Sequence, residues 1–179
     1  METTNKKIAY SILELAIVSS GVTLEQTFKN SVDLAQKTEE MGYKRFWLAE
    51  HHNMIHVASV ATSVLIGHIA GNTKSIRVGS GGIMLPNHSP LIVAEQFGTL
   101  GRLYPNRIDL GLGRAPGTDQ ITAHAIRSDR MQSVHNFPGE IKQIQKYFSS
   151  ENEWSQVRAV VAEGVNVPLY ILGSSLDSA

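Results

Sequence analysis

The sequence predicts an α/β protein built around a parallel sheet. Short apolar runs alternate with stretches of helical periodicity along the chain. This alternation favours parallel strands joined by right-handed helical crossovers. Polar residues and glycines follow each apolar run, as is typical of the carboxyl edge of such a sheet. A doubly wound sheet and a (β/α)8 barrel share this pattern, and both gather functional residues at that edge.

Five apolar runs are predicted to form strands. They cover residues 8–16, 45–49, 76–85, 107–113 and 167–172. The third run contains Gly79, Gly81 and Gly82. Glycine inside a strand marks either a bulge or a place where a ligand comes close to the backbone.

Four helices are predicted between and after these strands, and most have recognisable ends. Thr23 and Gln26 form a capping box before the first helix, and Gly42 can end it. Ser89 is the expected N-cap of the third helix, with Pro90 in its first turn. Residues 115–136 give mixed signals. The predicted helices are residues 23–42, 58–70, 89–103 and 138–148.

The composition is that of a globular protein, and we expect a single domain over residues 1–179. Apolar residues make up 42% of the chain and charged residues 18%. The formal net charge is zero, which gives no reason to expect nucleic acid or an anionic membrane as a partner.

No apolar run approaches the roughly 20 residues of a membrane span, and no signal peptide is expected. The chain has no cysteine, which excludes disulfides and cysteine-ligated metals and fits the cytoplasm.

The ends of the predicted strands carry the candidate functional residues. Glu50, His51 and His52 follow the second strand, and Pro86-Asn-His88 follows the third. The fourth strand leads into Gly111-Leu-Gly-Arg114, and the fifth leads into a serine-rich turn. The alternative for Glu50 is structural, because a buried carboxylate needs a cationic partner. The candidate partners are Arg77, Arg107 and Arg114.

The serine-rich turn, residues 173–178, suits an anion. Serine hydroxyls beside the free N–H groups of a helix start can bind a phosphate without a lysine. The alternative is ordinary N-capping by Ser174 or Ser175. Gly111-x-Gly113 is not a dinucleotide fingerprint, since the third glycine is misplaced and Pro116 follows.

Metal and hydrolase chemistry are less favoured by the residues. His52 and His56 are four residues apart and would share a helix face, but no acidic third ligand stands at an obvious spacing. No Gly-x-Ser-x-Gly elbow is present for a serine nucleophile. We therefore expect no metal, and a metal-dependent hydrolase on a barrel remains a rival interpretation.

Four segments in order resemble the luciferase-like flavin monooxygenases, in particular an alkanal-monooxygenase-like subgroup. They span most of the chain, and their combination is more specific than any one of them. The segments read FWLAEHH (46–52), IRVGSGGIMLPNHSPLIVAEQ (76–96), NRIDLGLGRAPGTD (106–119) and VPLYILGSSLDSA (167–179).

The resemblance implies a (β/α)8 barrel of which this chain holds about strands 1–5, an incomplete barrel. It implies reduced FMN as cofactor, with the deazaflavin F420 as the less favoured alternative. By position, His51 matches the catalytic histidine, with Glu50 and His52 beside it. The implied cofactor-binding residues are Gly81 and Gly82 under the flavin ring, Arg114 near the flavin, and Ser174, Ser175 and Ser178 at the phosphate.

The implied function is oxidation of a small organic substrate, with an aldehyde as the expected class, by reduced FMN and O2. Histidine suits the acid–base role because its unperturbed pKa is near 6.5. A flavin reductase is an expected partner, and so is an oligomer or a complementing chain, because family barrels are much longer. The main alternative is a non-catalytic flavin-binding or accessory subunit.

Overall fold

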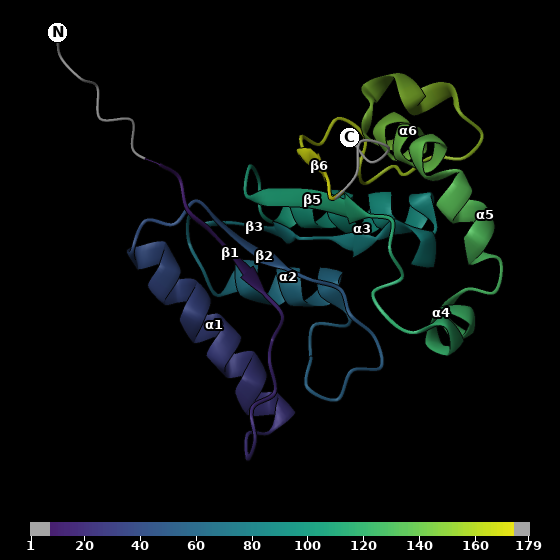
Figure 1. Ribbon diagram of the computed structural model, residues 1–179. Coiled ribbons are helices and arrows are strands. Elements are labelled where there is room, and N and C mark those ends of the chain that lie inside the picture. The colour runs from purple at the N-terminus through teal and green to yellow at the C-terminus, as the bar shows by residue number, and fades with distance from the viewer. Residues whose placement is uncertain (1–7, 174–179) are drawn as a thin grey trace, which may run out of the picture.

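The computed structural model describes residues 8–173, which form one curved parallel sheet with helices packed against it (Figure 1). The elements, in chain order, are β1 (Ser11–Glu14), α1 (Leu24–Glu40), β2 (Arg45–Leu48), α2 (Thr62–Gly71), β3 (Arg77–Ser80), β4 (Ile83–Met84), the 3-10 helix η1 (Leu85–Asn87), α3 (Pro90–Leu103), β5 (Ile108–Gly113), α4 (Gln120–Ile126), α5 (Arg130–His135), α6 (Phe137–Phe148), the 3-10 helix η2 (Ser150–Trp154) and β6 (Leu169–Ile171).

The strands lie side by side in the order of the chain. β1 pairs with β2 and β2 with β3, while β5 pairs with β3, β4 and β6, and every one of these pairs is parallel. A doubly wound sheet reverses its strand order at a switch point. The order never reverses within the described residues, which argues against the doubly wound alternative and for a barrel wall.

One face of this wall is covered by helices and forms the core. Phe46, Val78 and Leu110 project there from successive strands and are fully buried. Ile66 of α2 and Phe97 of α3 pack against them in the same cluster. Because side chains alternate along a strand, the neighbouring positions of β1, β2, β3 and β5 face the other way.

The opposite face carries a polar cluster around Asp109. Leu13, Trp47, Gly79 and Asp109 occupy matched positions across four strands. Gly79 has no side chain, and an added Cβ would lie 2.4 Å from the Asp109 carbonyl oxygen. The Trp47 indole therefore reaches over it and donates to Asp109 Oδ2 at 3.1 Å.

Two guanidinium groups complete the Asp109 cluster. Arg45 Nε donates to Asp109 Oδ2 at 3.1 Å, and Arg77 Nε donates to Oδ1 at 2.9 Å. The carboxylate is fully buried, so its charge is stabilised only by these donors. Because Arg77 binds Asp109, it is not available as a partner for Glu50.

The continuous strand predicted over residues 76–85 is wrong, because it is interrupted between β3 and β4. The peptide bond between Gly81 and Gly82 is cis. Just before it, the Ser80 hydroxyl donates to the Gly111 carbonyl at 2.8 Å and accepts from the Gly111 N–H at 2.9 Å. At this point the Ser80 side chain takes the place of the backbone hydrogen bonds between the strands. Backbone pairing with β5 resumes at Ile83.

Other predicted elements differ mainly at their ends. Residues 58–61 precede α2 because Ala58 and Ser59 donate backbone hydrogen bonds to residues 16 and 15 instead. Thr23 accepts from the Gln26 N–H at 3.2 Å, but the Gln26 side chain donates to Asn30, so only half of the predicted capping box forms. Ser89 holds the N-cap position of α3 but makes no side-chain capping bond. The stretch with mixed signals contains α4 and α5.

Removing the Asp109 carboxylate should destabilise the fold strongly. Asp109→Ala leaves two arginines without their acceptor in the sheet, and breaking a buried pair costs about 3–5 kcal/mol. Urea unfolding followed by circular dichroism measures this loss. The exposed Asp33→Ala serves as control and should unfold close to wild type. An Asp109 variant as stable as that control would show that the cluster contributes nothing.

Candidate functional site

Glu50 organises the carboxyl edge of the sheet just beyond β2. Its side chain is 1% exposed. Nε2 of His52 lies 2.9 Å from Glu50 Oε1, and Nε2 of His88 lies 2.9 and 3.0 Å from its two oxygens. The Met84 N–H donates to Oε2 at 3.0 Å, and the Asn87 side-chain amide donates to Oε1 at 3.2 Å. One carboxylate therefore joins β2, β4 and η1.

Glu50 is ionised at neutral pH. Burial alone would raise its pKa, but hydrogen bonds from His52, His88 and the Met84 N–H outweigh it and hold the pKa at about 2. The structural alternative, in which Glu50 pairs with Arg77, Arg107 or Arg114, is not found. Arg107 donates to backbone carbonyls near residues 70–76, and two imidazoles contact Glu50 instead of a guanidinium.

Asn87 links this carboxylate to a buried arginine. Arg130 Nε donates to Asn87 Oδ1 at 3.2 Å, and an Arg130 terminal nitrogen donates to the Arg114 carbonyl at 3.2 Å. Arg130 is 7% exposed, and burial lowers its pKa. No carboxylate of the described part of the chain pairs with it. A buried guanidinium with spare donors can bind an anion.

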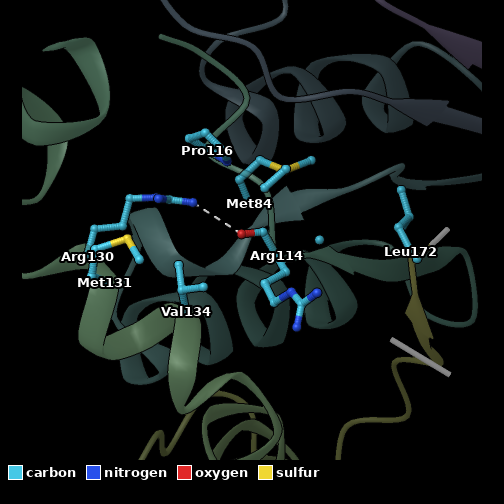
Figure 2. A pocket seen from close by; sticks show the side chains of 10 residues that line it. Met84, Arg114, Pro116, Arg130, Met131, Val134 and Leu172 are labelled. Atoms are coloured by element: carbon cyan, nitrogen blue, oxygen red, sulfur yellow. Dashed lines mark hydrogen bonds between the residues drawn. The ribbon is translucent and has the colours of Figure 1, made fainter. Parts of the chain in front are cut away.

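Arg130 opens onto a cavity of about 560 Å³ beside β5 (Figure 2). Figure 2 shows Arg114 and Arg130 reaching it from different segments, together with the apolar side chains of Met131 and Val134. The wall thus combines two cations with apolar surface. Its lining residues are Met84, Gly113, Arg114, Ala115, Pro116, Arg130, Met131, Val134, Leu172 and Gly173.

Two loops at this edge are tied to each other. The His52 N–H donates to the Gly117 carbonyl at 3.0 Å, and the Thr118 hydroxyl donates to the His52 carbonyl at 2.8 Å. Gly117 has a φ of +66°, and an added Cβ would lie 2.6 Å from the Glu50 carbonyl oxygen. Only glycine fits there, so this residue fixes how the loop after β5 approaches the histidines.

Asp119 fixes the far end of the same loop. It accepts backbone hydrogen bonds from residues 121 and 122 and a side-chain bond from Thr122 at 2.7 Å, and these hold its pKa at about 2. The Asn53 amide donates to the Thr122 hydroxyl at 2.9 Å, which joins the loop after β2 to the start of α4.

His51 offers a free polar group, whereas the glycine pair is closely packed by the protein itself. Nδ1 of His51 is buried without a hydrogen-bond partner. A Cβ on Gly81 would lie 2.8 Å from the Leu13 side chain, and a Cβ on Gly82 would lie 2.8 Å from the Gly111 carbonyl oxygen. Packing within the protein thus requires both glycines, and the unpartnered nitrogen of His51 is the feature that suits a ligand.

The predicted site residues divide into three groups. Glu50 and His52 are in direct contact, and Arg114 lines the cavity to which Asn87 and Arg130 connect them. His51, Gly81 and Gly82 lie on the same strand ends but do not line that cavity. Ser174, Ser175 and Ser178 lie outside the described residues, although Gly173, just before them, belongs to the cavity wall.

Sequence reasoning placed Asn87 and His88 at the end of the third strand without giving them a role, and it missed Arg130. His88 and Asn87 stand directly after the third predicted strand, so their position was a usable signal. Arg130 lies in the stretch of mixed signals, and nothing local to it indicates burial. Only the tertiary contact with Asn87 shows its importance.

The metal alternative depended on the spacing of His52 and His56. Residues 50–57 form no helix, so the spacing of His52 and His56 creates no shared face. The described residues contain no group of three or more acidic or imidazole side chains arranged to hold a metal ion. Among them, no helix is both long and apolar enough to cross a membrane.

Comparison with known proteins identifies relatives across the chain. The family model described as luciferase-like monooxygenase matches residues 10–177. The protein YvbT of Bacillus subtilis strain 168 is 59% identical over 175 residues, which cover 97% of this chain and 52% of YvbT. A luciferase-like monooxygenase of Escherichia coli K12 is 52% identical over 176 residues, covering 98% of this chain and 52% of that protein.

Solved structures with a similar fold also match over most of this chain. The crystal structure of apo-MsnO8 has a TM-score of 0.88 at 38% identity, over 96% of this chain and 52% of MsnO8. The oxygenating constituent of 3,6-diketocamphane monooxygenase from Pseudomonas putida, solved with FMN, has a TM-score of 0.76 at 17% identity, over 95% and 52%. An F420-dependent secondary alcohol dehydrogenase, solved with an F420–acetone adduct, has a TM-score of 0.69 at 16% identity, over 93% and 52%.

These likenesses, with the chain-ordered parallel sheet, show an incomplete (β/α)8 barrel of the luciferase-like type. The two structures below 25% identity speak for the fold alone. The chain spans about half the length of the curated relatives it matches.

The ionised state of Glu50 predicts a pH-dependent stability. Its pKa of about 2 lies below the ordinary 4.5, so its contribution is complete above pH 4.5 and is lost as the pH falls toward 2. The free energy of unfolding of wild type relative to Glu50→Gln should therefore drop by about 3 kcal/mol across this range. Urea unfolding at several pH values measures it, with exposed Glu40→Gln as control. A pH-independent difference would refute the ionised carboxylate.

Proposed function

This chain belongs to the luciferase-like monooxygenase family, and we propose that it contributes the flavin site of an FMN-dependent monooxygenase. The substrate is a small organic molecule, with an aldehyde as the expected class. The observation that carries the proposal is Arg130, a buried guanidinium without a carboxylate partner in the described chain, facing a cavity that Arg114 also lines.

The chemistry of FMN matches the two kinds of surface at this edge. FMN joins a flat, largely apolar ring system to a phosphate ester through a flexible tail. Arg114 and Arg130 would hold the phosphate, since a guanidinium binds phosphate oxygens with a pair of parallel donors. Ser174, Ser175 and Ser178 follow the cavity wall in sequence and would add hydroxyl and N–H donors. Gly81 and Gly82 would lie under the ring.

The residues of this chain would position the ligand and handle protons. When bound, reduced FMN supplies the electrons that activate O2 for oxygen transfer. His51, with its unpartnered Nδ1, would donate or accept a proton at the reacting group. Glu50 would keep His52 oriented beside it. The apolar side chains of the cavity would exclude water from the reacting atoms.

FMN is favoured over F420 because relatives close enough to compare in sequence are named monooxygenases. A Bacillus subtilis N-acetyl-S-alkylcysteine monooxygenase is 38% identical over 176 residues. We expect a separate flavin reductase to deliver reduced FMN in the cytoplasm.

A flavin-binding accessory role is the second candidate. It needs only the ligand contacts proposed for Arg114 and Arg130 and no acid–base step at His51. O2 consumption coupled to a flavin reductase separates the two candidates. Stoichiometric FMN binding without coupled O2 consumption would favour the accessory role.

The phosphate contact can be tested by comparing two flavins. Arg130→Gln should weaken FMN binding by about 10- to 100-fold, the usual value of one or two charge-assisted hydrogen bonds. Riboflavin, which lacks the phosphate, should bind both forms equally. Fluorescence quenching gives both affinities, and the exposed Lys142→Gln is the control. Equal loss of both flavins would show a packing defect instead of phosphate binding.

His51 can be tested separately from cofactor binding. His51→Ala should retain FMN affinity and lower reductase-coupled turnover by about 100-fold or more, as expected for loss of an acid–base group. The exposed His68→Ala, on α2, should behave like wild type in both assays. Unchanged turnover would remove His51 from the chemical step.

A further inference from the structure

We propose that Glu50 fixes His52 and His88 in the same neutral tautomer, with Nε2–H toward the carboxylate. The site would then present two imidazole Nδ1 atoms as acceptors to its ligand. His88 thereby joins the site as a second imidazole, and Glu50 is a positioning residue for both rings. The use of these rings in oxidation rests on the proposed function, whereas their tautomers follow from the hydrogen bonds alone.

Every neighbour of the Glu50 carboxylate must act as a donor. The Met84 backbone N–H has no alternative role. The Asn87 side chain cannot be turned round, because its oxygen accepts from Arg130 and its NH2 group donates to the Pro116 carbonyl at 2.8 Å. An ionised carboxylate only accepts. Both imidazoles at 2.9 Å must therefore donate through Nε2–H.

A neutral imidazole carries one N–H, so donation from Nε2 leaves Nδ1 with a free lone pair. No hydrogen bond within residues 8–173 engages Nδ1 of His52 or His88. The two side chains are 21% and 28% exposed, so a ligand can reach them. The matching ligand group is an N–H or O–H donor, as in a flavin ring or a hydrated carbonyl compound.

Other charged side chains near the pair are engaged by other partners. Arg127 donates to the His88 carbonyl at 2.7 Å, and Arg130 approaches through Asn87. Asp119 is occupied by Thr122 and the start of α4. Glu50 is thus the one carboxylate in hydrogen-bond contact with either ring among the described residues, and it is shared between them.

The tautomers can be measured directly by two-bond ¹H–¹⁵N NMR of the full 179-residue chain. The spectrum is recorded without flavin at pH about 9, above the ordinary imidazole pKa of about 6.5. His52→Gln and His88→Gln assign the two rings among the seven histidines. Both rings should show the Nε2–H pattern. An Nδ1–H pattern or a persistent imidazolium in either ring would overturn the proposal.

Glu50→Ala provides the sharper test, because it removes the acceptor of both rings at once. Neither ring is then held in the Nε2–H form, and both should move toward a mixture of the two tautomers. Rings that keep the pure Nε2–H pattern would contradict the role of Glu50, and Glu40→Ala should leave both rings unchanged.

If Glu50→Ala does not fold, His88→Gln answers the same question. It leaves Oε1 free to accept from His52, which should remain Nε2–H, and a switch of that ring would overturn the proposal. None of these spectra involves FMN or O2. A failure here therefore leaves the FMN affinity test with Arg130→Gln untouched, and a failure of that test leaves the tautomers standing.

Discussion

The structure of the site depends on one buried carboxylate that remains charged. Glu50 lies at the end of β2, where burial opposes ionisation, and it stays ionised because donors from β4 and η1 converge on it with the imidazole of His52. Those donors belong to segments far apart in the chain. The charge therefore sets the relative positions of the loops after β2 and β3, and through Asn87 it also positions Arg130.

Glycines in the sheet make this arrangement possible. Gly79 lets Trp47 reach Asp109, and Gly111 lets the Ser80 hydroxyl take over the ladder hydrogen bonds. The strand then breaks at Gly81 and Gly82, and β4 turns toward Glu50. These strands come so close that only glycine fits between their backbones. Their carboxyl ends therefore lie together at one edge of the sheet.

The sequence was sufficient for the parallel α/β architecture, because strand and helix periods alternate and glycine or capping residues mark most boundaries. It also placed Glu50, His52 and Arg114 at one edge. It failed where partners are set by tertiary contact. The sequence left an arginine open as the partner of Glu50, whereas the structure shows an imidazole pair, since Arg77 binds Asp109 and Arg107 binds backbone carbonyls. Arg130 could not be found because its burial depends on α5 packing beside η1.

The central claim is that this edge surrounds a single flavin. A crystal structure of the chain grown with FMN tests it most directly. The account predicts the ring system against Gly81 and Gly82, facing His51, with the phosphate within hydrogen-bond distance of the Arg114 or Arg130 guanidinium. FMN bound elsewhere, for example in the apolar groove between α1 and α2 near Phe28 and Val64, would contradict it.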